Sequence, residues 1–435
     1  MPGKRPINAD LPPVPEESSA PPEPEPSRTP RRRRPVPGAL KGIAGLVVVA
    51  IVFLVAAVLG GGGANRATEE ASTPTIAPPS QAGSETPPAE AAEELGFPSI
   101  ATNNTTRVGG SDPASTAAAV ALAVYPARTP AQRPAAVTLV DEGDWQGAVA
   151  AAVLMASPVR APLLVTSGGD LPDATAQALE ALAPRGDKET GGAQAFAIGD
   201  AASPEELKTT DLHGANPAAE AAAIATARDK LIGGAPEHVV LVSAEDPEFA
   251  VPAAAWAARS GDPVLFAEPT GLPAATAAAL KRHPKVPVYL LGPSSAIPSD
   301  VFREVAEIDP NVRRVSGEDP VGNAIALARY AGGGFGWNVN DPGHGFVVAR
   351  DDAPLQAAIA APLSASGTWG PLLLTDNPDT LPPALREYMF DVKPGYTTDP
   401  TRAFYNHVWV IGDEEEIDVN QQAEIDQLAE LAQIG

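Results

Sequence analysis

One ordered pattern occurs three times in this 435-residue chain, and it constrains the fold more than any other feature of the sequence. A glycine, a spacer, an acid or its amide, and a proline follow one another as GSDP, GANP and GEDP. The third residues of these patterns, Asp112, Asn216 and Asp319, stand 104 and 103 residues apart. Such regular spacing predicts a threefold internal duplication.

The segments after each pattern repeat in the same order. An apolar run, an acidic turn and an alanine-rich segment come first, as VTLVDEGDWQGAVAAAVLMAS in the first copy. A second apolar run follows as APLLVTSGGDLP, DPVLFAEPTGLP or GPLLLTDNPDTLP, and the unit closes with AFAIGD, VYLLGP or VWVIGD. We expect repeats at residues 99–208, 209–311 and 312–435.

Each unit has the sequence pattern of an α/β fold. Short runs rich in Val, Leu and Ile are typical of strands buried on both faces, and they alternate with segments of helical length. This alternation predicts parallel sheets covered by helices, which is the Rossmann-like class. The alanine-rich stretches let helices pack closely on a sheet.

The repeated GxDP and GxNP patterns are expected to begin helices. Asp112, Asn216 and Asp319 would accept hydrogen bonds from free N–H groups of a first helical turn, and the next residue, proline, needs no such bond. The glycine two positions earlier permits a tight exit from the preceding strand. The same helix-starting role is expected of the prolines in the LP pairs, Pro172, Pro273 and Pro382.

A transmembrane helix is predicted at residues 42–62. The 18 residues of GIAGLVVVAIVFLVAAVL carry no charge and would span about 27 Å as a helix, close to the apolar thickness of a bilayer. Arginines 31–34 precede the segment, which indicates a cytoplasmic N-terminus and an exported C-terminal region. A cleaved signal peptide ending near Ala64 is the alternative. Residues 1–41 and 63–98 are proline-rich and are expected to be a disordered tail and linker.

Charge and composition restrict the partners. Residues 1–41 have a net charge of +3, and the rest of the chain has 22 Lys+Arg against 49 Asp+Glu. Because so acidic a region repels polyanions at long range, we expect no nucleic-acid partner. The chain has no cysteine, and its five histidines lack the spacing of a zinc site, so no metal or other cofactor is expected.

The order RVxGxD, apolar strand, alanine-rich helix, PLLV-like strand, LP and a strand ending in glycine resembles the cell wall binding repeat 2 family. The resemblance covers about residues 100–435. It implies a pseudo-threefold assembly of three Rossmann-like modules on the surface of a Gram-positive cell, attached to an anionic wall polymer. It also implies polymer binding by the PLLV-like motifs, whose residues here are Pro162, Leu163, Leu164, Val165, Pro263, Val264, Leu265, Phe266, Pro371, Leu372, Leu373 and Leu374. The arginine and aromatic residue that follow GxD in the family are absent from all three copies.

Acidic residues are expected where strands end, as in the DEGD turn that begins at Asp141. They are interpreted as solvated loop residues, with a divalent cation bridging them to wall phosphates as the alternative. No dinucleotide fingerprint follows a strand, and the chain has neither a P-loop nor a nucleophile elbow. We therefore expect no enzyme.

Two insertions in the third copy concentrate aromatic residues. They are GGGFGWNVNDPGHG from Gly332 and DVKPGYTTDPTRAFYNH from Asp391. Trp337, Tyr396, Arg402 and Tyr405 are candidate partner contacts, unless these loops pack back on the body of the protein. The GGGFG stretch itself is interpreted as a flexible loop.

Together these features predict a single-pass membrane protein with a cytoplasmic N-terminus and a non-catalytic, extracytoplasmic domain that binds a cell-wall polymer. The alternative is a protein-interaction scaffold of the cell envelope that has lost polymer binding.

Overall fold

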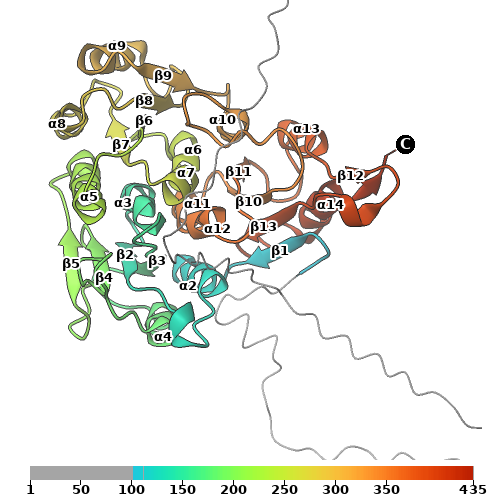
Figure 1. Ribbon diagram of the computed structural model, residues 1–435, viewed down its shortest axis with the longest axis horizontal. Coiled ribbons are helices and arrows are strands. Elements are labelled where there is room, and N and C mark those ends of the chain that lie inside the picture. Colours follow the sequence, from blue (N-terminus) through green and yellow to red (C-terminus); the bar gives the residue numbers. More distant parts are fainter. Residues whose placement is uncertain (1–100, 111, 435) are drawn as a thin grey trace, which may run out of the picture. The chain divides into compact units, whose positions relative to one another are not determined.

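The computed structural model describes residues 101–110 and 112–434 (Figure 1). The predicted tail, membrane helix and linker lie outside these residues. Within the described ranges, every helix is too short or too polar to cross a bilayer. The described residues all belong to one compact unit.

Three parallel four-stranded sheets form the framework of the fold, as the repeats predict. Each repeat contributes to these sheets an opening strand before its GxDP or GxNP pattern and three further strands after it. In every sheet, the middle one of these three strands lies at one edge, followed by the earlier and then the later of the other two. The opening strand of another repeat lies at the opposite edge. The first sheet contains β3 (Leu163–Thr166), β2 (Val137–Asp141), β4 (Ala195–Ile198) and β5 (Thr209–Leu212). The second contains β7 (Val264–Ala267), β6 (Val239–Ser243), β8 (Val288–Leu291) and β9 (Val312–Val315). The third contains β11 (Leu372–Thr375), β10 (Gly345–Arg350), β13 (His407–Ile411) and β1 (Thr105–Val108).

Helices connect these strands and cover the sheets (Figure 1). Those of the first repeat are α2 (Pro113–Val124), η1 (Pro130–Gln132), α3 (Trp145–Ala151), η2 (Ala152–Met155) and α4 (Asp173–Leu182). Those of the second are α5 (Pro217–Ile232), α6 (Pro247–Ala250), α7 (Pro252–Ser260), α8 (Ala274–Arg282) and α9 (Ser299–Ile308). Those of the third are α10 (Pro320–Arg329), α11 (Pro354–Ile359), α12 (Ala361–Ala365), α13 (Pro383–Asp391), η3 (Pro400–Arg402) and α14 (Val419–Ala429). A two-stranded ladder of β12 (Gly395–Tyr396) and β14 (Ala432–Gln433) lies beside them.

The repeats are interlocked, because the opening strand of each belongs to the sheet of another repeat. β5 pairs with β4, and β9 pairs with β8. The chain's first described strand, β1, pairs with β13 near the C-terminus, so that Thr105 is in register with Val408. The opening helices α2, α5 and α10 then pack against β3, β7 and β11, the edge strands of their own repeats. Sequence units and sheets are thus offset by one strand.

Alanine-rich helices of all three repeats meet in one shared core. Helix α7 packs against α12 and η2, and α3 packs against α11. Ala253, Ala254 and Ala257 of α7 are fully buried in these contacts. Small side chains allow such close approach, so the alanine stripes predicted to pack on sheets also join one repeat to the next.

The GxDP and GxNP patterns lie where the chain passes from one sheet to another. Asp112, Asn216 and Asp319 are the N-caps of α2, α5 and α10, and each side chain accepts a hydrogen bond from the backbone N–H three residues later, at 2.9, 2.9 and 2.6 Å. The preceding glycine is needed for close approach: a Cβ on Gly317 would lie 2.1 Å from a backbone atom of Gly322. Pro172, Pro273 and Pro382 occupy the residue before α4, α8 and α13.

Candidate functional site

The PLLV-like motifs form buried edge strands. They cover the starts of β3, β7 and β11, and all twelve of their side chains are buried. Leu164, Leu265 and Leu373 are 0 to 1% exposed. These side chains pack in the core and are not accessible to a polymer. They could affect polymer binding only indirectly, by positioning the strands and loops around them.

All three sheets point their carboxyl ends toward the same side of the fold. Each opening helix, such as α5, begins where a strand of one sheet ends and leads back to the start of a strand in the next sheet. The carboxyl ends therefore form one edge and the amino ends the opposite edge. In α/β sheets, ligands favour the carboxyl edge, particularly where the chain direction reverses.

The carboxyl edge is acidic, and its carboxylates are largely engaged in organising their own turns. Asp141 accepts hydrogen bonds from the backbone of Gly143 and Gly168 at 3.0 and 2.8 Å. Glu142 accepts one from the Ser167 hydroxyl at 2.6 Å. Asp144 caps α3. These contacts are those of structural loop residues, and no group of three His, Cys, Asp or Glu side chains in the described ranges is placed to hold a metal ion.

One acid at this edge is buried beside another. Glu220, in the first turn of α5, is 7% exposed and lies against Asp144, the N-cap of α3. Burial, the charge of Asp144, a hydrogen bond between the two side chains and the charge of Asp200 together raise the pKa of Glu220 to about 8. The pair therefore holds a proton at neutral pH.

Glu220 occupies a position that is polar and buried in every copy, four residues after the cap. Its counterparts are Thr116 and Asn323, both fully buried. Their side-chain oxygens accept hydrogen bonds from the backbone N–H of Gly110 and Gly317 at 3.1 and 3.3 Å. The position thus has a structural role in the first and third copies, and only the second places an ionisable group there. Sequence reasoning missed it, although the spacing from the cap could have revealed it.

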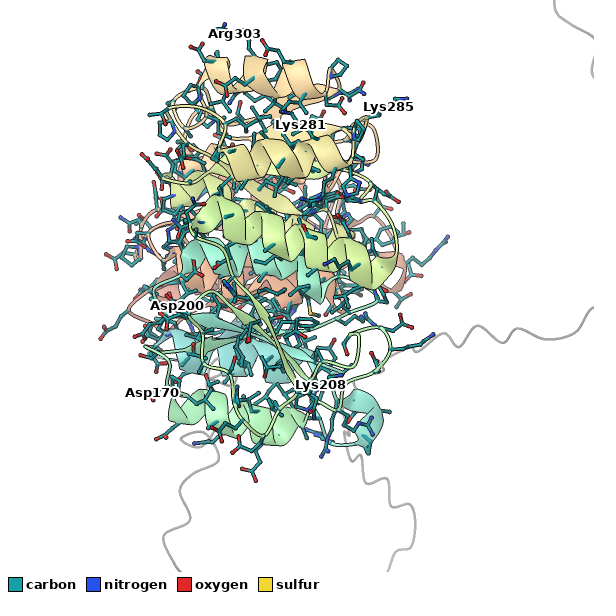
Figure 2. All side chains as sticks on the ribbon, turned by 90° about the vertical axis from the view of Figure 1, so that its left-hand side faces the viewer. Asp170, Asp200, Lys208, Lys281, Lys285 and Arg303 are labelled. Atoms are coloured by element: carbon teal, nitrogen blue, oxygen red, sulfur yellow. The ribbon has the colours of Figure 1, made fainter. Side chains whose placement is uncertain are left out.

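The amino edge carries much of the positive charge. Figure 2 shows Asp170 and Asp200, which follow β3 and β4, on one side of the fold and Lys208, which precedes β5, on the other. Lys285 precedes β8 and lies on the same side as Lys208. These two lysines thus lie opposite the two acids along the strand direction.

A cavity of about 440 Å³ lies between α8 and α9 in the second copy. It is lined by Leu272, Ala277, Lys281, Glu304, Glu307 and Ile308. Glu304 accepts a hydrogen bond from the Leu272 backbone at 2.9 Å. Its lining combines both signs of charge and includes none of the motif residues above.

The first insertion of the third copy packs on the second copy, contrary to the flexible loop expected for GGGFG. Phe335 is 1% exposed and stacks on Tyr289 with ring centroids 3.9 Å apart. Trp337 is 5% exposed and meets Trp256 edge-on. The candidate partner contact Trp337 therefore packs inside the fold, against an aromatic residue of the second copy.

A buried histidine holds the same loop in place, and no motif around it indicates this role. His238 Nδ1 lies 3.1 Å from Asp262, and its Nε2 lies 2.9 Å from the carbonyl oxygen of Gly333. Burial opposes protonation of the ring, but these two hydrogen bonds outweigh it and raise the pKa of His238. The imidazolium is suited to donate to both acceptors.

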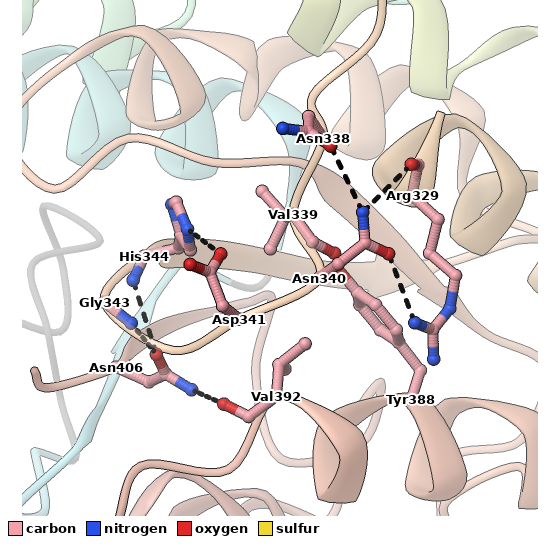
Figure 3. A network of polar contacts seen from close by, with 10 residues as sticks. All are labelled: Arg329, Asn338, Val339, Asn340, Asp341, Gly343, His344, Tyr388, Val392 and Asn406. Carbon is pink, nitrogen blue, oxygen red and sulfur yellow. Dashed lines mark hydrogen bonds and ion pairs between the residues drawn. The ribbon is translucent and has the colours of Figure 1, made fainter. Parts of the chain in front are cut away.

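The rest of this insertion is tied to the second one by a polar network (Figure 3). Asn406 accepts hydrogen bonds from the backbone of Gly343 and His344 and donates one to the carbonyl oxygen of Val392. The Tyr388 hydroxyl donates to the carbonyl oxygen of Val339 at 3.0 Å. The network holds both loops at the amino edge of the third sheet.

The other candidate contacts remain at the surface. Arg402 is exposed, Tyr405 is 55% exposed, and Tyr396 is half-buried in β12. The Tyr405 hydroxyl donates only to the nearby carbonyl oxygen of Pro400. Their part in partner binding stays a prediction.

Three interlocked parallel sheets with a buried PLLV-like strand in each place the protein in a class of modular α/β domains. Residues 212–302, from the last residue of β5 into α9, match the family described as Cell wall binding domain 2 (CWB2). This match confirms the family resemblance in the second copy. No curated protein matches the chain.

Two solved structures share the fold. Cwp8 from Clostridium difficile has 20% sequence identity and a TM-score of 0.57, over 75% of this chain and 52% of that one. Cwp6 from Clostridium difficile has 18% identity and a TM-score of 0.58, over 75% of this chain and 47% of that one. The chain thus spans about half the length of either protein.

Proposed function

We propose that this protein attaches to a cell-wall polymer through its folded region, outside the cytoplasm and without catalysis, and that the predicted helix at 42–62 holds it in the membrane. The match of residues 212–302 to Cell wall binding domain 2 carries this proposal. The repetition of the same sheet three times supports it, because a repeated module suits a repeated polymer.

Sedimentation with cell walls tests the proposal. The full-length chain in neutral detergent is mixed with purified Gram-positive cell walls, either intact or stripped of anionic polymer. We expect the chain to pellet with intact walls and to stay in solution with stripped ones. Equal pelleting with both would point to peptidoglycan, and no pelleting with either would reject wall attachment.

A protein-interaction scaffold is the second candidate, and one observation favours it. All large hydrophobic side chains that are exposed in the described ranges lie in the third copy, namely Trp369, Phe390, Phe404, Tyr405, Val419 and Ile434. Exposed aromatic groups of this kind often mark protein contacts. Replacing Phe390, Phe404 and Tyr405 with serine should then abolish capture of an envelope protein while leaving wall sedimentation unchanged.

A further inference from the structure

The loops that precede the strands of the first sheet form one continuous surface. Val137 of β2 is in register with Ala195 of β4, which is in register with Thr209 of β5, and Thr138 pairs with Leu163, the first residue of β3. The four strands therefore start at one level. The loops 125–136, 156–162 and 183–194, together with the residues just before β5, meet at that edge.

Hydrogen bonds join these loops to one another. The Tyr125 hydroxyl donates to the carbonyl oxygen of Arg160 at 2.8 Å, and Arg185 donates to the carbonyl oxygen of Pro130 at 3.1 Å. The side chain of Gln194 accepts from the Lys208 backbone at 3.0 Å. The surface is thus held by contacts between loops and does not depend on a single flexible segment.

Four arginines of this surface have no acidic partner. Arg128, Arg160 and Arg185 are exposed and Arg133 is half-buried. None of the four takes part in an ion pair with the residues that the structure describes. Lys188 pairs with the adjacent Glu189, and Asp187 is the other acid in the loops 125–136, 156–162 and 183–194. The segment before β5 adds Lys208 and the acids Glu205 and Glu206. We call Arg128, Arg133, Arg160 and Arg185 the arginine group.

At the corresponding edges of the other sheets, several cations have acidic partners. In the second sheet, Arg282 and His283 both face Asp229, at 3.8 and 2.7 Å. In the third sheet, Arg329 pairs with Asp391. The arginine group thus gathers four arginines that form no ion pair with the described residues at one edge of one sheet, in a chain whose net charge is −24.

We infer that the arginine group is the surface on which the protein binds its anionic polymer, with phosphate or carboxylate groups of the polymer as the ligands. This inference rests on the proposed function and assigns polymer binding to the amino edge of the first sheet. Guanidinium groups bind both anions through paired N–H donors. The acidic carboxyl edge repels the same polymer, so the charge distribution orients the molecule on it.

The position of a PLLV-like motif fits this assignment. Arg160 stands two residues before Pro162, where the motif of the first copy begins. The motif's side chains are buried in β3, whereas Arg160 is exposed at the start of the same strand. The buried strand would thus fix the arginine in place instead of contacting the polymer itself.

Sedimentation of substituted chains with intact cell walls tests the inference. Arg133 and Arg185 donate hydrogen bonds to backbone carbonyl oxygens. Arg128→Gln combined with Arg160→Gln leaves both of these bonds intact, so the fold should be preserved. Adding Arg133→Gln and Arg185→Gln removes the whole group. We expect the quadruple variant to bind at least about tenfold more weakly than the unsubstituted chain, and the double variant to be intermediate. The salt dependence of binding should be largest for the unsubstituted chain, smaller for the double variant and smallest for the quadruple variant. Thermal unfolding by circular dichroism verifies that each variant is folded.

A matched control carries Lys230→Gln, Lys281→Gln, Lys285→Gln and Arg303→Gln, four exposed cations of the second copy. Normal binding by the control and weak binding by the folded double and quadruple variants would support the arginine group. Equal losses in the control would show that only net charge matters and would overturn the inference. Unchanged binding of the folded quadruple variant would also overturn it while leaving wall attachment intact, whereas failure of the unsubstituted chain to sediment would reject the proposed function itself.

Competition with soluble polyanions then identifies the anion. Polyphosphate and polyglutamate are added to the sedimentation mixture at equal charge concentration. Stronger release by polyphosphate indicates a phosphate-bearing polymer, and stronger release by polyglutamate a carboxylate-bearing one. Release by neither, at low ionic strength, would contradict ionic binding by the arginine group.

Discussion

The guanidinium of Arg107 donates a hydrogen bond of 2.6 Å to the carbonyl oxygen of Ile417, 310 residues further along the chain. It also donates to the carbonyl oxygens of Gly412 and Asp413. The side chain is 1% exposed, and burial lowers its pKa against the opposing effect of nearby acids such as Glu414. Arg107 thus joins the first described strand to the loop after the last strand of the third sheet.

Replacing Arg107 with methionine should destabilise the protein by about 3 kcal/mol. The buried carbonyl oxygens would lose a charged donor that methionine cannot replace. Urea unfolding followed by circular dichroism measures the change. Arg402→Met, at an exposed position, is the control, and equal stability of the two variants would contradict a structural role for Arg107.

Glu220→Gln should stabilise the protein at pH 8 to 9 and have little effect near pH 4.5. The folded-state pKa of about 8 lies above the ordinary value of 4.5, so folding favours the protonated form. The cost of ionising Glu220 is therefore absent below pH 4.5, grows as the pH rises toward 8 and then levels off, reaching on the order of 2–4 kcal/mol.

Thermal unfolding of the Glu220 variant and the unsubstituted chain across this pH range measures the difference. Glu245→Gln, an exposed acid at the same edge, controls for the general loss of negative charge. If the Glu220 variant gains no stability relative to the Glu245 variant between pH 5 and 9, the buried carboxyl pair does not hold a proton.

Gly317→Ala should cost about 3 kcal/mol. A Cβ at this position would lie 2.1 Å from a backbone atom of Gly322 and 2.2 Å from the backbone nitrogen of Asn323, and neither can move without disturbing the start of α10. Gly234→Ala is the control, because no atom lies within 4 Å of a Cβ there. Chemical denaturation should separate the two variants clearly, and similar midpoints would refute the close-approach argument.

Phe335→Ala should destabilise the protein by about 3–5 kcal/mol, as expected for truncation of a buried aromatic side chain. Phe335 stacks on Tyr289 and meets Trp256 with ring centroids 5.0 Å apart, so the loss would loosen the insertion from the second copy. Phe390→Ala, at a residue 67% exposed, should have little effect. Differential scanning calorimetry compares them, and a fully stable Phe335 variant would show that the loop does not anchor the two copies.

The strands and helix starts could be predicted because their signals are local. Runs such as VTLV contain enough apolar residues to be recognised alone, and Asp112 acts on a backbone group only three residues away. The match of residues 212–302 to the family likewise depends on an ordered series of such segments. The boundaries at 99, 209 and 312 stay predictions.

The interlocking of the sheets could not be predicted, because nothing near Thr105 indicates that its partner is Val408. For a similar reason, the sequence could not decide whether Trp337 is exposed to a partner or packed back on the body of the protein. A glycine-rich stretch with aromatic residues is typical of an exposed loop, but here its partners Trp256 and Tyr289 come from an earlier repeat. Distant pairing of this kind leaves no mark in the local sequence.

The pairing of β1 with β13 also limits how many modules the architecture accepts. A fourth copy would have to add its opening strand beside the last strand of the third, but β1 already occupies that place. The pairing of β1 with β13 thus closes the ring of three modules. Inserting a fourth module would require displacing β1, which Arg107 holds in position. Three is the number at which this fold is complete.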